Sequence, residues 1–442
     1  MVNIRLGLAL AAMVAIAPGG ALAEQGKTPA PQTHEGVSAK AIELPRTAAF
    51  AKQFVNDDRA PGIVIAVGAD GDAPTFVTEG RIADDSDTAA TPDTLWRVYS
   101  MTKPITAMAA MTLIEDGKMS LDQPVSDFIP AFKDMKVLVA PDTDSLETRP
   151  AKRQMTIRNL LTHTAGLGYS IVTKGALLKE YEKNGILPAT LSRGYEQGVR
   201  ATRPASLEEF ADRLAKLPLI ADPGTKWSYS IGLDLMGRVI EVASGMPFDR
   251  YVQTRILTPL KMESTYWTVP ADQKARLATN YIWMGDSRVA VDPGANSVFL
   301  DPPSFPYGGA GLVMSARDYD RFLHMLQNGG TLDGAQVMKP ETVKLAMSNL
   351  LPQGVTYSSV DEATGGSAGP KTGYGAGGSV YLEDVPGGPG KGTYGWGGAA
   401  GTIAWVDPEK QVRGTVMVNY IPADKWPLRR EIVSRVYADL GK

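Results

Sequence analysis

The chain has 442 residues, of which 43% are hydrophobic and 21% are charged, as in an ordinary soluble globular protein. Its formal net charge of -3 indicates neither nucleic acid nor an anionic membrane surface as a partner. The sequence contains no cysteine, which excludes a disulfide framework, a thiol nucleophile and a cysteine-based metal site.

The N-terminus has the pattern of a secretory signal sequence over residues 1–23. Arg5 supplies a positive charge, residues 6–17 form an apolar run, and Ala21-Leu22-Ala23 fits a small-residue cleavage site. An uncleaved membrane anchor is the alternative, but the apolar run is short for a spanning helix. We therefore expect a mature chain that begins at Glu24, is periplasmic or secreted, and has no stable membrane insertion once the signal is removed.

Hydrophobic patterns predict strands near both ends of the chain and helices in its middle. A helix over residues 42–57 precedes the apolar, β-branched segment Gly62 to Gly68, which is typical of a buried strand, and residues 73–78 fit its hairpin partner. Further helices are predicted over residues 155–162, 206–215, 232–243, 315–327 and 428–440, and further strands over 379–382, 402–406 and 414–420. Loops or irregular stretches are expected at 136–153, 168–204, 269–300 and 352–378. This distribution predicts an α+β fold whose sheet is built from both termini, with a helical insertion between them.

The segment that carries chemistry is Ser100-Met101-Thr102-Lys103. The residues after it predict a helix that Gly117 stops, so Ser100 lies at a helix N-terminus, where backbone N–H groups favour negative charge. Lys103 follows three residues later on the same face, where it can take the proton of the serine hydroxyl. S-x-x-K is a signature of serine enzymes, although the same letters also occur as a helix cap followed by a surface lysine.

A second serine motif, Gly365-Gly366-Ser367-Ala368-Gly369, matches the G-x-S-x-G of α/β-hydrolases. That motif requires a strand before the serine and a helix after it, whereas this copy lies in a Gly-rich loop before Pro370. The hydrolase order also needs a histidine after the serine, and the last histidine of the chain is His324. A Ser367 triad in that order is therefore excluded.

Metal and cofactor motifs are missing from the sequence. The three histidines are His34, His163 and His324. Their spacing fits no metal site, and the chain has no Walker-type phosphate loop, so we expect neither a metal nor a cofactor.

Five segments, taken together, resemble the serine β-lactamase-like superfamily, which includes class C β-lactamases, D-Ala-D-Ala peptidases and family VIII carboxylesterases. They are Ser100-Met101-Thr102-Lys103, Leu160-Leu161-Thr162-His163-Thr164-Ala165-Gly166, Pro223-Gly224-Thr225 with Tyr229-Ser230, Gly308-Gly309-Ala310-Gly311-Leu312, and Gly395-Trp396-Gly397-Gly398. The resemblance covers most of residues 42–440. It implies one β-lactamase-like domain over 24–440 with an antiparallel sheet flanked by helices. Its α/β part would span about 40–104 and 305–440, and its mostly helical inserted part about 105–304.

The resemblance favours the esterase branch. Where class C β-lactamases carry Tyr-x-Asn and Lys-Thr-Gly, this chain has Tyr229-Ser230-Ile231 followed by Asp234, and Trp396-Gly397-Gly398, which are similar to the family VIII pattern. By this likeness Tyr229 is the second catalytic residue and relays a proton, and the N–H groups of Ser100 and Ala399 form the oxyanion hole. Substrate-pocket positions implied in the same way are Tyr99, Ile231, Trp396, Gly397 and Gly398. We expect the two glycines to let the strand approach the substrate closely.

The expected activity is hydrolysis of short-chain carboxylic esters through an acyl-enzyme on Ser100, with a small-molecule ester as substrate. A β-lactamase or D-Ala-D-Ala carboxypeptidase is one alternative. An acyltransferase, or a penicillin-binding module that stays acylated as a sensor, is another. The sequence does not separate hydrolysis from acyl transfer, because the acceptor depends on access to the pocket.

Overall fold

The computed structural model describes residues 42–357 and 370–442. The predicted signal sequence (1–23), the segment up to residue 41 and Ser367 lie outside the described residues. The helices are α1 (Pro45–Asn56), α2 (Thr102–Glu115), α3 (Ile157–Leu161), α4 (Gly175–Lys183), α5 (Arg193–Val199), α6 (Leu207–Leu214), α7 (Gly232–Ser244), α8 (Phe248–Val252), α9 (Ala316–Gln327), α10 (Pro340–Ala346) and α12 (Leu428–Leu440).

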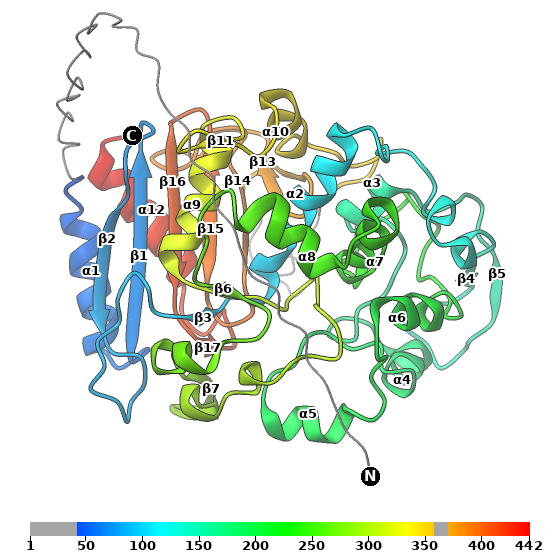
Figure 1. Cartoon of the computed structure of the whole chain (residues 1–442), viewed down its shortest axis with the longest axis horizontal. Coiled ribbons are helices and arrows are strands. Elements are labelled where there is room, and N and C mark those ends of the chain that lie inside the picture. The colour runs from blue at the N-terminus through cyan, green and yellow to red at the C-terminus, as the bar shows by residue number, and fades with distance from the viewer. Residues whose placement is uncertain (1–41, 358–369) are drawn as a thin grey trace, which may run out of the picture. The chain divides into compact units, whose positions relative to one another are not determined.

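A seven-stranded antiparallel sheet is formed within residues 42–357 and 370–442, in the order β12-β13-β14-β15-β16-β1-β2 (Figure 1). These strands are β1 (Gly62–Ala69), β2 (Thr75–Gly80), β12 (Thr372–Tyr374), β13 (Ser379–Tyr381), β14 (Tyr394–Gly397), β15 (Ile403–Asp407) and β16 (Val412–Met417). β1 is buried along its whole length and pairs with β16, with Val64 opposite Met417. Segments from the two ends of the chain therefore share one sheet, which confirms the predicted α+β fold.

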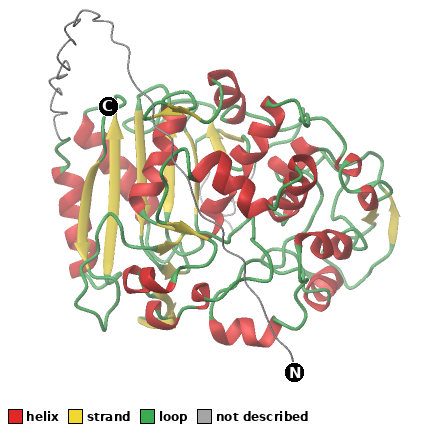
Figure 2. Ribbon diagram, viewed as in Figure 1, coloured by secondary structure: helices red, strands yellow, loops and turns green. Residues whose placement is uncertain are grey.

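Helices cover both faces of this sheet (Figure 2). α1 and α12 contact each other on one face, and their apolar side chains form a cluster with Ile63, Ile65 and Val67 of β1. Val64 points the other way, into a larger apolar cluster that includes Phe322 of α9. Because successive side chains of a strand point to opposite faces, β1 contributes to both cores.

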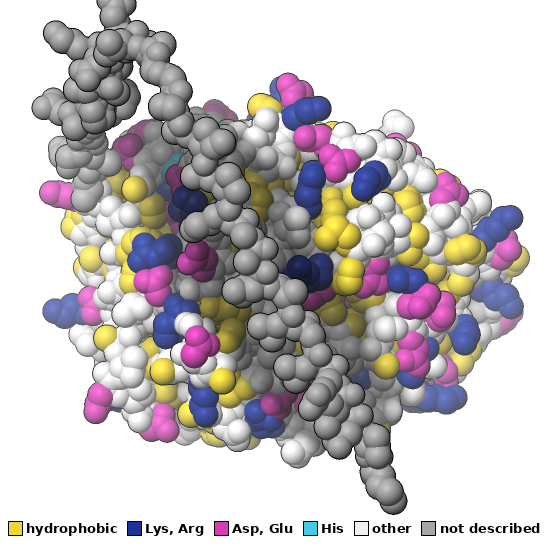
Figure 3. Space-filling view, in the orientation of Figure 1, with side chains coloured by type: hydrophobic (Ala, Val, Ile, Leu, Met, Phe, Trp, Pro, Cys, Tyr) yellow, Lys and Arg dark blue, Asp and Glu magenta, His cyan; other side chains and the backbone are white. Residues whose placement is uncertain are grey.

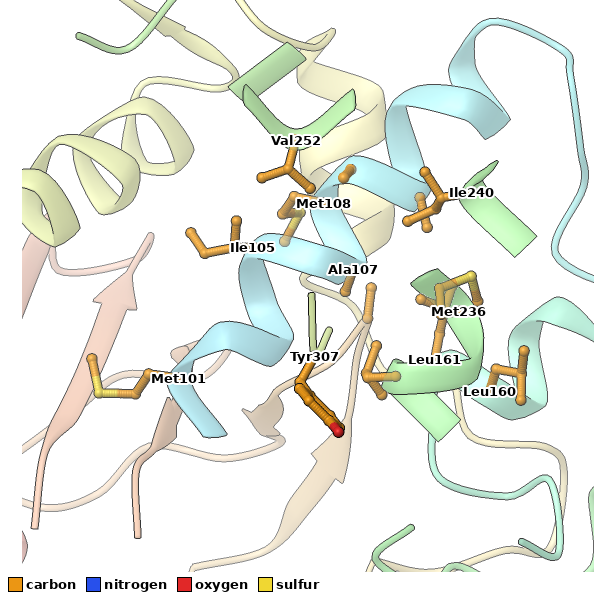
Figure 4. Close-up of a cluster of buried hydrophobic side chains, with 14 of the residues drawn as sticks. Met101, Ile105, Ala107, Met108, Leu160, Leu161, Met236, Ile240, Val252 and Tyr307 are labelled. Atoms are coloured by element: carbon orange, nitrogen blue, oxygen red, sulfur yellow. The ribbon is translucent and has the colours of Figure 1, made fainter. Parts of the chain in front are cut away.

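α2 is buried on all sides, and its residues from Thr102 to Leu113 all lie in the interior. A helix that is apolar all round belongs in a core, and α2 contacts α7, α8 and α10. Figure 4 shows part of this packing, in which Met108 of α2 lies beside Val252 of α8. The N-terminal end of this rigid helix carries the predicted nucleophile.

The predicted helices of the middle region are present, and their caps explain where they begin. At α3, Thr156 accepts from the backbone N–H of Asn159, whose side chain accepts from the Thr156 N–H in return, which is a capping box. Ser206 caps α6 by accepting from the backbone N–H of Glu209, whose own side chain accepts from the N–H of Ala205. α7 ends at Gly245, which has the left-handed φ of 73° that glycine adopts readily.

Regular structure also occurs where none was expected. The stretch 269–300 contains a hairpin of β7 (Asn280–Met284) and β8 (Ser287–Asp292), and β17 (Tyr420–Ile421) adds to it in parallel. The stretch 168–204 contains α4 and α5. The remaining short strands are β3 (Trp96–Arg97), β4 (Lys136–Leu138), β5 (Thr148–Pro150), β6 (Thr265–Tyr266), β9 (Val313–Met314), β10 (Thr331–Leu332) and β11 (Ala335–Gln336). The remaining short strands have only two or three residues each, and β3, β6 and β9 pair with segments far away in the sequence, so local patterning does not reveal them.

None of the helices in residues 42–357 and 370–442 has the length and apolar character of a transmembrane segment. On the face drawn in Figure 3, acidic and basic side chains are interspersed rather than gathered into one large patch of a single sign.

Candidate active site

Ser100 lies in a tight 3-10 turn, Tyr99–Met101, that leads directly into α2. Tyr99 has a φ of 40°, in the left-handed region that a residue with a side chain seldom adopts. Its buried ring contacts Phe299 at 6.2 Å between centroids, and its hydroxyl accepts a hydrogen bond from Asn280 Nδ2 at 3.0 Å. These contacts hold the strained residue in place, and they leave Ser100 partly exposed at the helix N-terminus.

Lys103 is buried, yet its ammonium group points at the serine. Nζ donates to Ser100 Oγ at 3.2 Å and to the carbonyl oxygen of Gly309 at 2.7 Å. It also lies 4.6 Å from the ring centroid of Tyr229, within the range of a cation–π contact. The predicted S-x-x-K pair is therefore in direct contact.

Tyr229 is the second side chain, after Lys103, that contacts the serine oxygen. Its hydroxyl donates to Ser100 Oγ at 2.7 Å. Its ring is held by edge contacts with His163 at 4.9 Å and Tyr169 at 5.4 Å, and by Trp396 at 5.7 Å. Four segments far apart in the sequence thus meet at one point.

Asp234 lies behind the lysine, in the first turn of α7. Its Oδ1 accepts from the backbone N–H of Gly309 at 3.0 Å, and the same Gly309 supplies the carbonyl that Lys103 contacts. A Cβ at position 309 would lie 2.4 Å from Asp234 Oδ2, so only glycine fits there. Burial raises the pKa of Asp234 to about 6, and the positive charge of Lys103 opposes that rise.

His163 is a buried neutral base beside Tyr229. Ser230 donates its backbone N–H to His163 Nδ1 at 3.2 Å, and the Ser230 hydroxyl lies 2.8 Å from the same nitrogen. Burial and the nearby charge of Lys103 hold the pKa of His163 well below its usual range. The ring therefore packs as an uncharged wall that fixes the segment carrying Tyr229.

β14 brings the Trp396-Gly397-Gly398 motif next to the Ser100 turn. A Cβ at Gly398 would lie 2.4 Å from the carbonyl oxygen of Val98, and one at Gly397 would lie 2.7 Å from Cζ of Arg429. In the structure these glycines make room for protein atoms, so that β14 can pack against the turn that holds Ser100. That they also let the strand approach the substrate stays a prediction.

Ala399 follows β14 and is exposed. Within the described part of the chain, neither the N–H of Ser100 nor that of Ala399 donates to a protein acceptor. Both donors are therefore available to a bound oxygen atom, as an oxyanion hole requires.

Two predicted pocket residues have a different position from the one expected. Ile231 has no exposed surface, because the chain turns into α7 directly after Ser230 and takes this side chain into the core. Tyr99 is also buried, with its ring against Phe299 rather than in an open pocket. Trp396 is only half buried and contacts Tyr229, as expected of a pocket wall.

Several residues of the site were not singled out from the sequence. Gly309 belongs to the motif Gly308-Gly309-Ala310-Gly311-Leu312, but no local pattern indicates that its carbonyl contacts Lys103. Tyr374, whose ring lies 5.3 Å from that of Trp396, and Arg429 come from segments with no motif. Tertiary packing alone brings them to the site.

A cavity of about 500 Å³ lies beside the loop that contains Gly309. Its walls include Tyr307 and Gly311, which flank Gly309, together with the aromatic rings of Trp267 and Phe299. In the described residues, no group of three or more acidic or histidine side chains is arranged to hold a metal ion.

A serine in contact with a lysine and a tyrosine, at the start of a buried helix beside an antiparallel sheet, defines a serine enzyme of the β-lactamase-like fold. The family model described as Beta-lactamase matches residues 47–433. The chain belongs to the Beta-lactamase family, and the predicted resemblance is confirmed.

Individual proteins support this assignment. Protein Rv1367c of Mycobacterium tuberculosis is 32% identical over 335 residues, which cover 75% of this chain and 78% of that protein. Esterase EstB of Burkholderia gladioli is 30% identical over 375 residues, which cover 80% of this chain and 85% of that protein. The structure of EstCE1, described as a hydrolase with promiscuous acyltransferase activity, is similar with a TM-score of 0.71 at 24% identity, covering 89% of this chain and 98% of that one.

Proposed function

We propose that the protein is a serine carboxylesterase that cleaves short-chain esters through an acyl-enzyme on Ser100. The observation that carries this proposal is the contact of Ser100 Oγ with both Lys103 Nζ at 3.2 Å and the Tyr229 hydroxyl at 2.7 Å. The relationship to Esterase EstB at 30% identity supports an ester as the substrate. No cofactor is part of the proposal.

In the first half-reaction, Ser100 Oγ attacks the ester carbonyl carbon as its proton passes to the Lys103–Tyr229 pair. The carbonyl electron pair moves onto oxygen, and this oxyanion accepts hydrogen bonds from the N–H groups of Ser100 and Ala399. The tetrahedral intermediate then collapses, the bond to the alkoxide breaks, and Tyr229 gives the alkoxide a proton. The products are an acyl-serine and a free alcohol.

In the second half-reaction, water takes the place of the alcohol. The same pair removes its proton as it attacks the acyl carbon, and Ser100 leaves with the proton returned to it. Gly309 and Asp234 support the lysine during this proton transfer. The Gly309 carbonyl orients the Lys103 ammonium, and the Asp234 carboxylate, hydrogen-bonded to the same glycine, offsets its positive charge.

The pocket wall supports a neutral ester over a β-lactam. Where β-lactamases present a cation to the substrate carboxylate, this chain presents the indole of Trp396. A carboxylate that lost its water against an indole would pay a desolvation cost of a few kcal/mol, roughly 1–3 for a neutral polar group and more for a charge.

The experiment that tests the proposal combines turnover with labelling of the nucleophile. Wild type should hydrolyse p-nitrophenyl acetate and butyrate, and Ser100→Ala should reduce this to background. Mass spectrometry after reaction with a p-nitrophenyl phosphonate should place the adduct on the peptide that contains Ser100. A phosphonate on Ser367, or full turnover by Ser100→Ala, would overturn the assignment.

Acyl transfer to an alcohol is the second candidate, and the description of EstCE1 as a hydrolase with promiscuous acyltransferase activity favours it. The acyl-enzyme is common to both reactions, and only the acceptor differs. Adding butanol or another simple alcohol to the p-nitrophenyl butyrate assay distinguishes them. A transferase gives the butyl ester as main product, whereas an esterase gives the acid.

The predicted signal sequence supports export as part of the proposal. A periplasmic or secreted location suits an enzyme without cysteine, because it needs no oxidative folding. N-terminal sequencing of the exported protein should give Glu24, and a chain that retained residues 1–23 would contradict this part of the proposal.

A further inference from the structure

Arg429, in the first turn of α12, contacts the loop that carries the Ala399 N–H. Its Nη2 donates to the carbonyl oxygen of Gly398 at 2.5 Å and to that of Thr402 at 3.2 Å. These two residues stand at the two ends of the loop that joins β14 to β15. One guanidinium therefore bridges both ends of the loop.

The loop itself is tight, and Ala400 within it is buried and accepts from the Tyr420 N–H at 3.1 Å. The Gly398 N–H donates to Thr402 O at 2.9 Å, and the Gly401 N–H donates to Gly398 O at 3.2 Å. Gly401 has a φ of 87°, a conformation that needs glycine. Ala399 is exposed at the tip of this loop, so the direction of its N–H is set by the anchored Ala400 on one side and by the closure of the loop at its base.

The sequence of β14 leaves space for the guanidinium. A Cβ at Gly397 would lie 2.7 Å from Arg429 Cζ, so a side chain at this position would displace the arginine. Trp396, the preceding residue, faces the other way, toward Tyr229. The strand thus presents its aromatic side chain to the reacting groups and its bare glycine backbone to Arg429.

We infer that Arg429 is a positioning residue for the oxyanion hole. This rests on the proposed function, because it assumes that the Ala399 N–H stabilises the oxyanion. Arg429 holds the carbonyls of Gly398 and Thr402, which fixes the loop and aims the N–H between them at the negative oxygen. A single nitrogen, Nη2, contacts both carbonyls, and the rigid guanidinium plane fixes its position between them.

The test compares Arg429→Met and Arg429→Lys with wild type, using Arg435→Met as the matched control. Arg435 lies on the same helix, but its guanidinium packs over Phe50 at 4.3 Å, on the far side from the site. Losing one oxyanion donor outright costs about 100- to 1000-fold in kcat, so loosening it should cost about 10- to 100-fold. We expect that loss in Arg429→Met with KM within about twofold, an intermediate value in Arg429→Lys, and no change in Arg435→Met.

A second readout separates aiming of the N–H from general damage to the pocket. A trifluoromethyl ketone adds reversibly to Ser100 Oγ and places an oxyanion in the hole. The matching secondary alcohol, in which the ketone carbonyl is reduced, binds without forming an oxyanion. In Arg429→Met the inhibition constant of the ketone should rise about as much as kcat/KM falls, and that of the alcohol should stay within twofold.

Equal weakening of both ligands, or an Arg429→Met enzyme as active as wild type, would overturn the inference. If Arg429→Met does not fold, the same comparison on Arg429→Lys decides, and an unchanged ketone constant there overturns it as well. The proposed function fails differently, through a wild type with no turnover that depends on Ser100. A Ser100-dependent esterase that is insensitive to Arg429 therefore contradicts only this inference.

Discussion

The hydroxyl of Tyr229 lies 2.7 Å from Ser100 Oγ, although 129 positions separate the two residues in the chain. Ser100 lies in the turn that leads into the buried helix α2, and Tyr229 lies in the segment before α7. The rings of His163 and Trp396 both contact the Tyr229 ring. The contact is therefore fixed by packing before any substrate binds. Such preorganisation is what lets a pair of ordinary side chains act on a serine without rearrangement during the reaction.

The three groups around this contact should behave as one unit. Lys103→Ala and Tyr229→Phe should each lower kcat for p-nitrophenyl acetate by about 100- to 10,000-fold, because proton transfer from the serine fails in either case. The double variant should be little worse than either single one, since groups that act together are not additive. Losses that multiply would show that the lysine and the tyrosine serve separate steps. Ser367→Ala is the control and should keep nearly full activity.

Asp234 predicts a step in the pH dependence of activity. Its pKa is raised to about 6 by burial, so the carboxylate is charged above that pH and protonated below it. Only the charged form offsets the positive charge of the Lys103 ammonium. The kcat of wild type should therefore fall as the pH drops through about 6. Asp234→Asn, which keeps an acceptor for the Gly309 N–H, should be less active at pH 8 and should lack this step.

The same group affects stability with the opposite trend. Because its pKa in the folded state lies above the unfolded value of about 3.9, Asp234 contributes stability below pH 4 that is lost as the pH rises to about 6. Urea unfolding of wild type and Asp234→Asn at pH 4 and pH 7 measures this contribution to the free energy of unfolding. A difference between the two proteins that did not change with pH would contradict the assignment of this pKa.

Gly398 should tolerate no side chain. A Cβ there would meet the Val98 carbonyl oxygen at 2.4 Å and Thr402 Oγ1 at 2.3 Å, at the base of the loop that carries Ala399. Gly398→Ala should push β14 away from the Ser100 turn and lower kcat/KM by at least about tenfold, with a lower melting temperature. Gly198→Ala is the matched control, because a Cβ at Gly198 in α5 meets no atom within 4 Å. Equal activity of the two variants would show that β14 is not pressed against the turn.

Much of this site was predictable because its parts are marked locally. Ser100 and Lys103 are three residues apart at the start of one helix. The sequence predicts α3, α6 and α9 because each begins with a capping Ser or Thr followed by a periodic apolar pattern. β1 could be predicted because a strand that is buried on both faces has a continuously apolar sequence. The resemblance to a known family then supplied Tyr229 and Trp396, which no local pattern marks.

The parts that escaped prediction are those that distant contacts determine. The β7–β8 hairpin is partly exposed and mixed in composition, and it is held by β17 from the end of the chain. Arg429 reaches its carbonyls only because α12 packs under the sheet. Ile231 was expected to line the pocket, but the start of α7 buries it. In each case tertiary packing decides the outcome, and sequence periodicity carries no information about it.

A buried ion pair beneath the Ser100 turn predicts a large effect on stability. Asp292 Oδ2 accepts from Arg97 Nε at 2.7 Å and from the Ser297 hydroxyl at 2.6 Å, and both charged side chains have at most 1% exposure. Asp292→Ala leaves a buried guanidinium uncompensated and should cost about 3–5 kcal/mol of unfolding free energy. Asp122→Ala, which removes an exposed pair with Arg158, should cost about 0–1 kcal/mol in the same urea titration. Similar losses in the two variants would contradict the buried character of the first pair.

Trp396 predicts which substrates the enzyme prefers. Its indole lies against Tyr229 and Tyr374 where a β-lactamase would present a cation, so a substrate carboxylate has no partner at this wall. At 1.36 kcal/mol for each tenfold in rate, a cost of about 3 kcal/mol makes kcat/KM for p-nitrophenyl butyrate roughly 100-fold higher than for a chromogenic cephalosporin. Trp396→Phe keeps the apolar wall and should keep this ratio, whereas Trp396→Lys should lower it by weakening the ester and favouring the carboxylate. Weak cephalosporin turnover fits this account, because the strained β-lactam ring is reactive in itself. A wild type that already prefers the cephalosporin would rule out the esterase assignment.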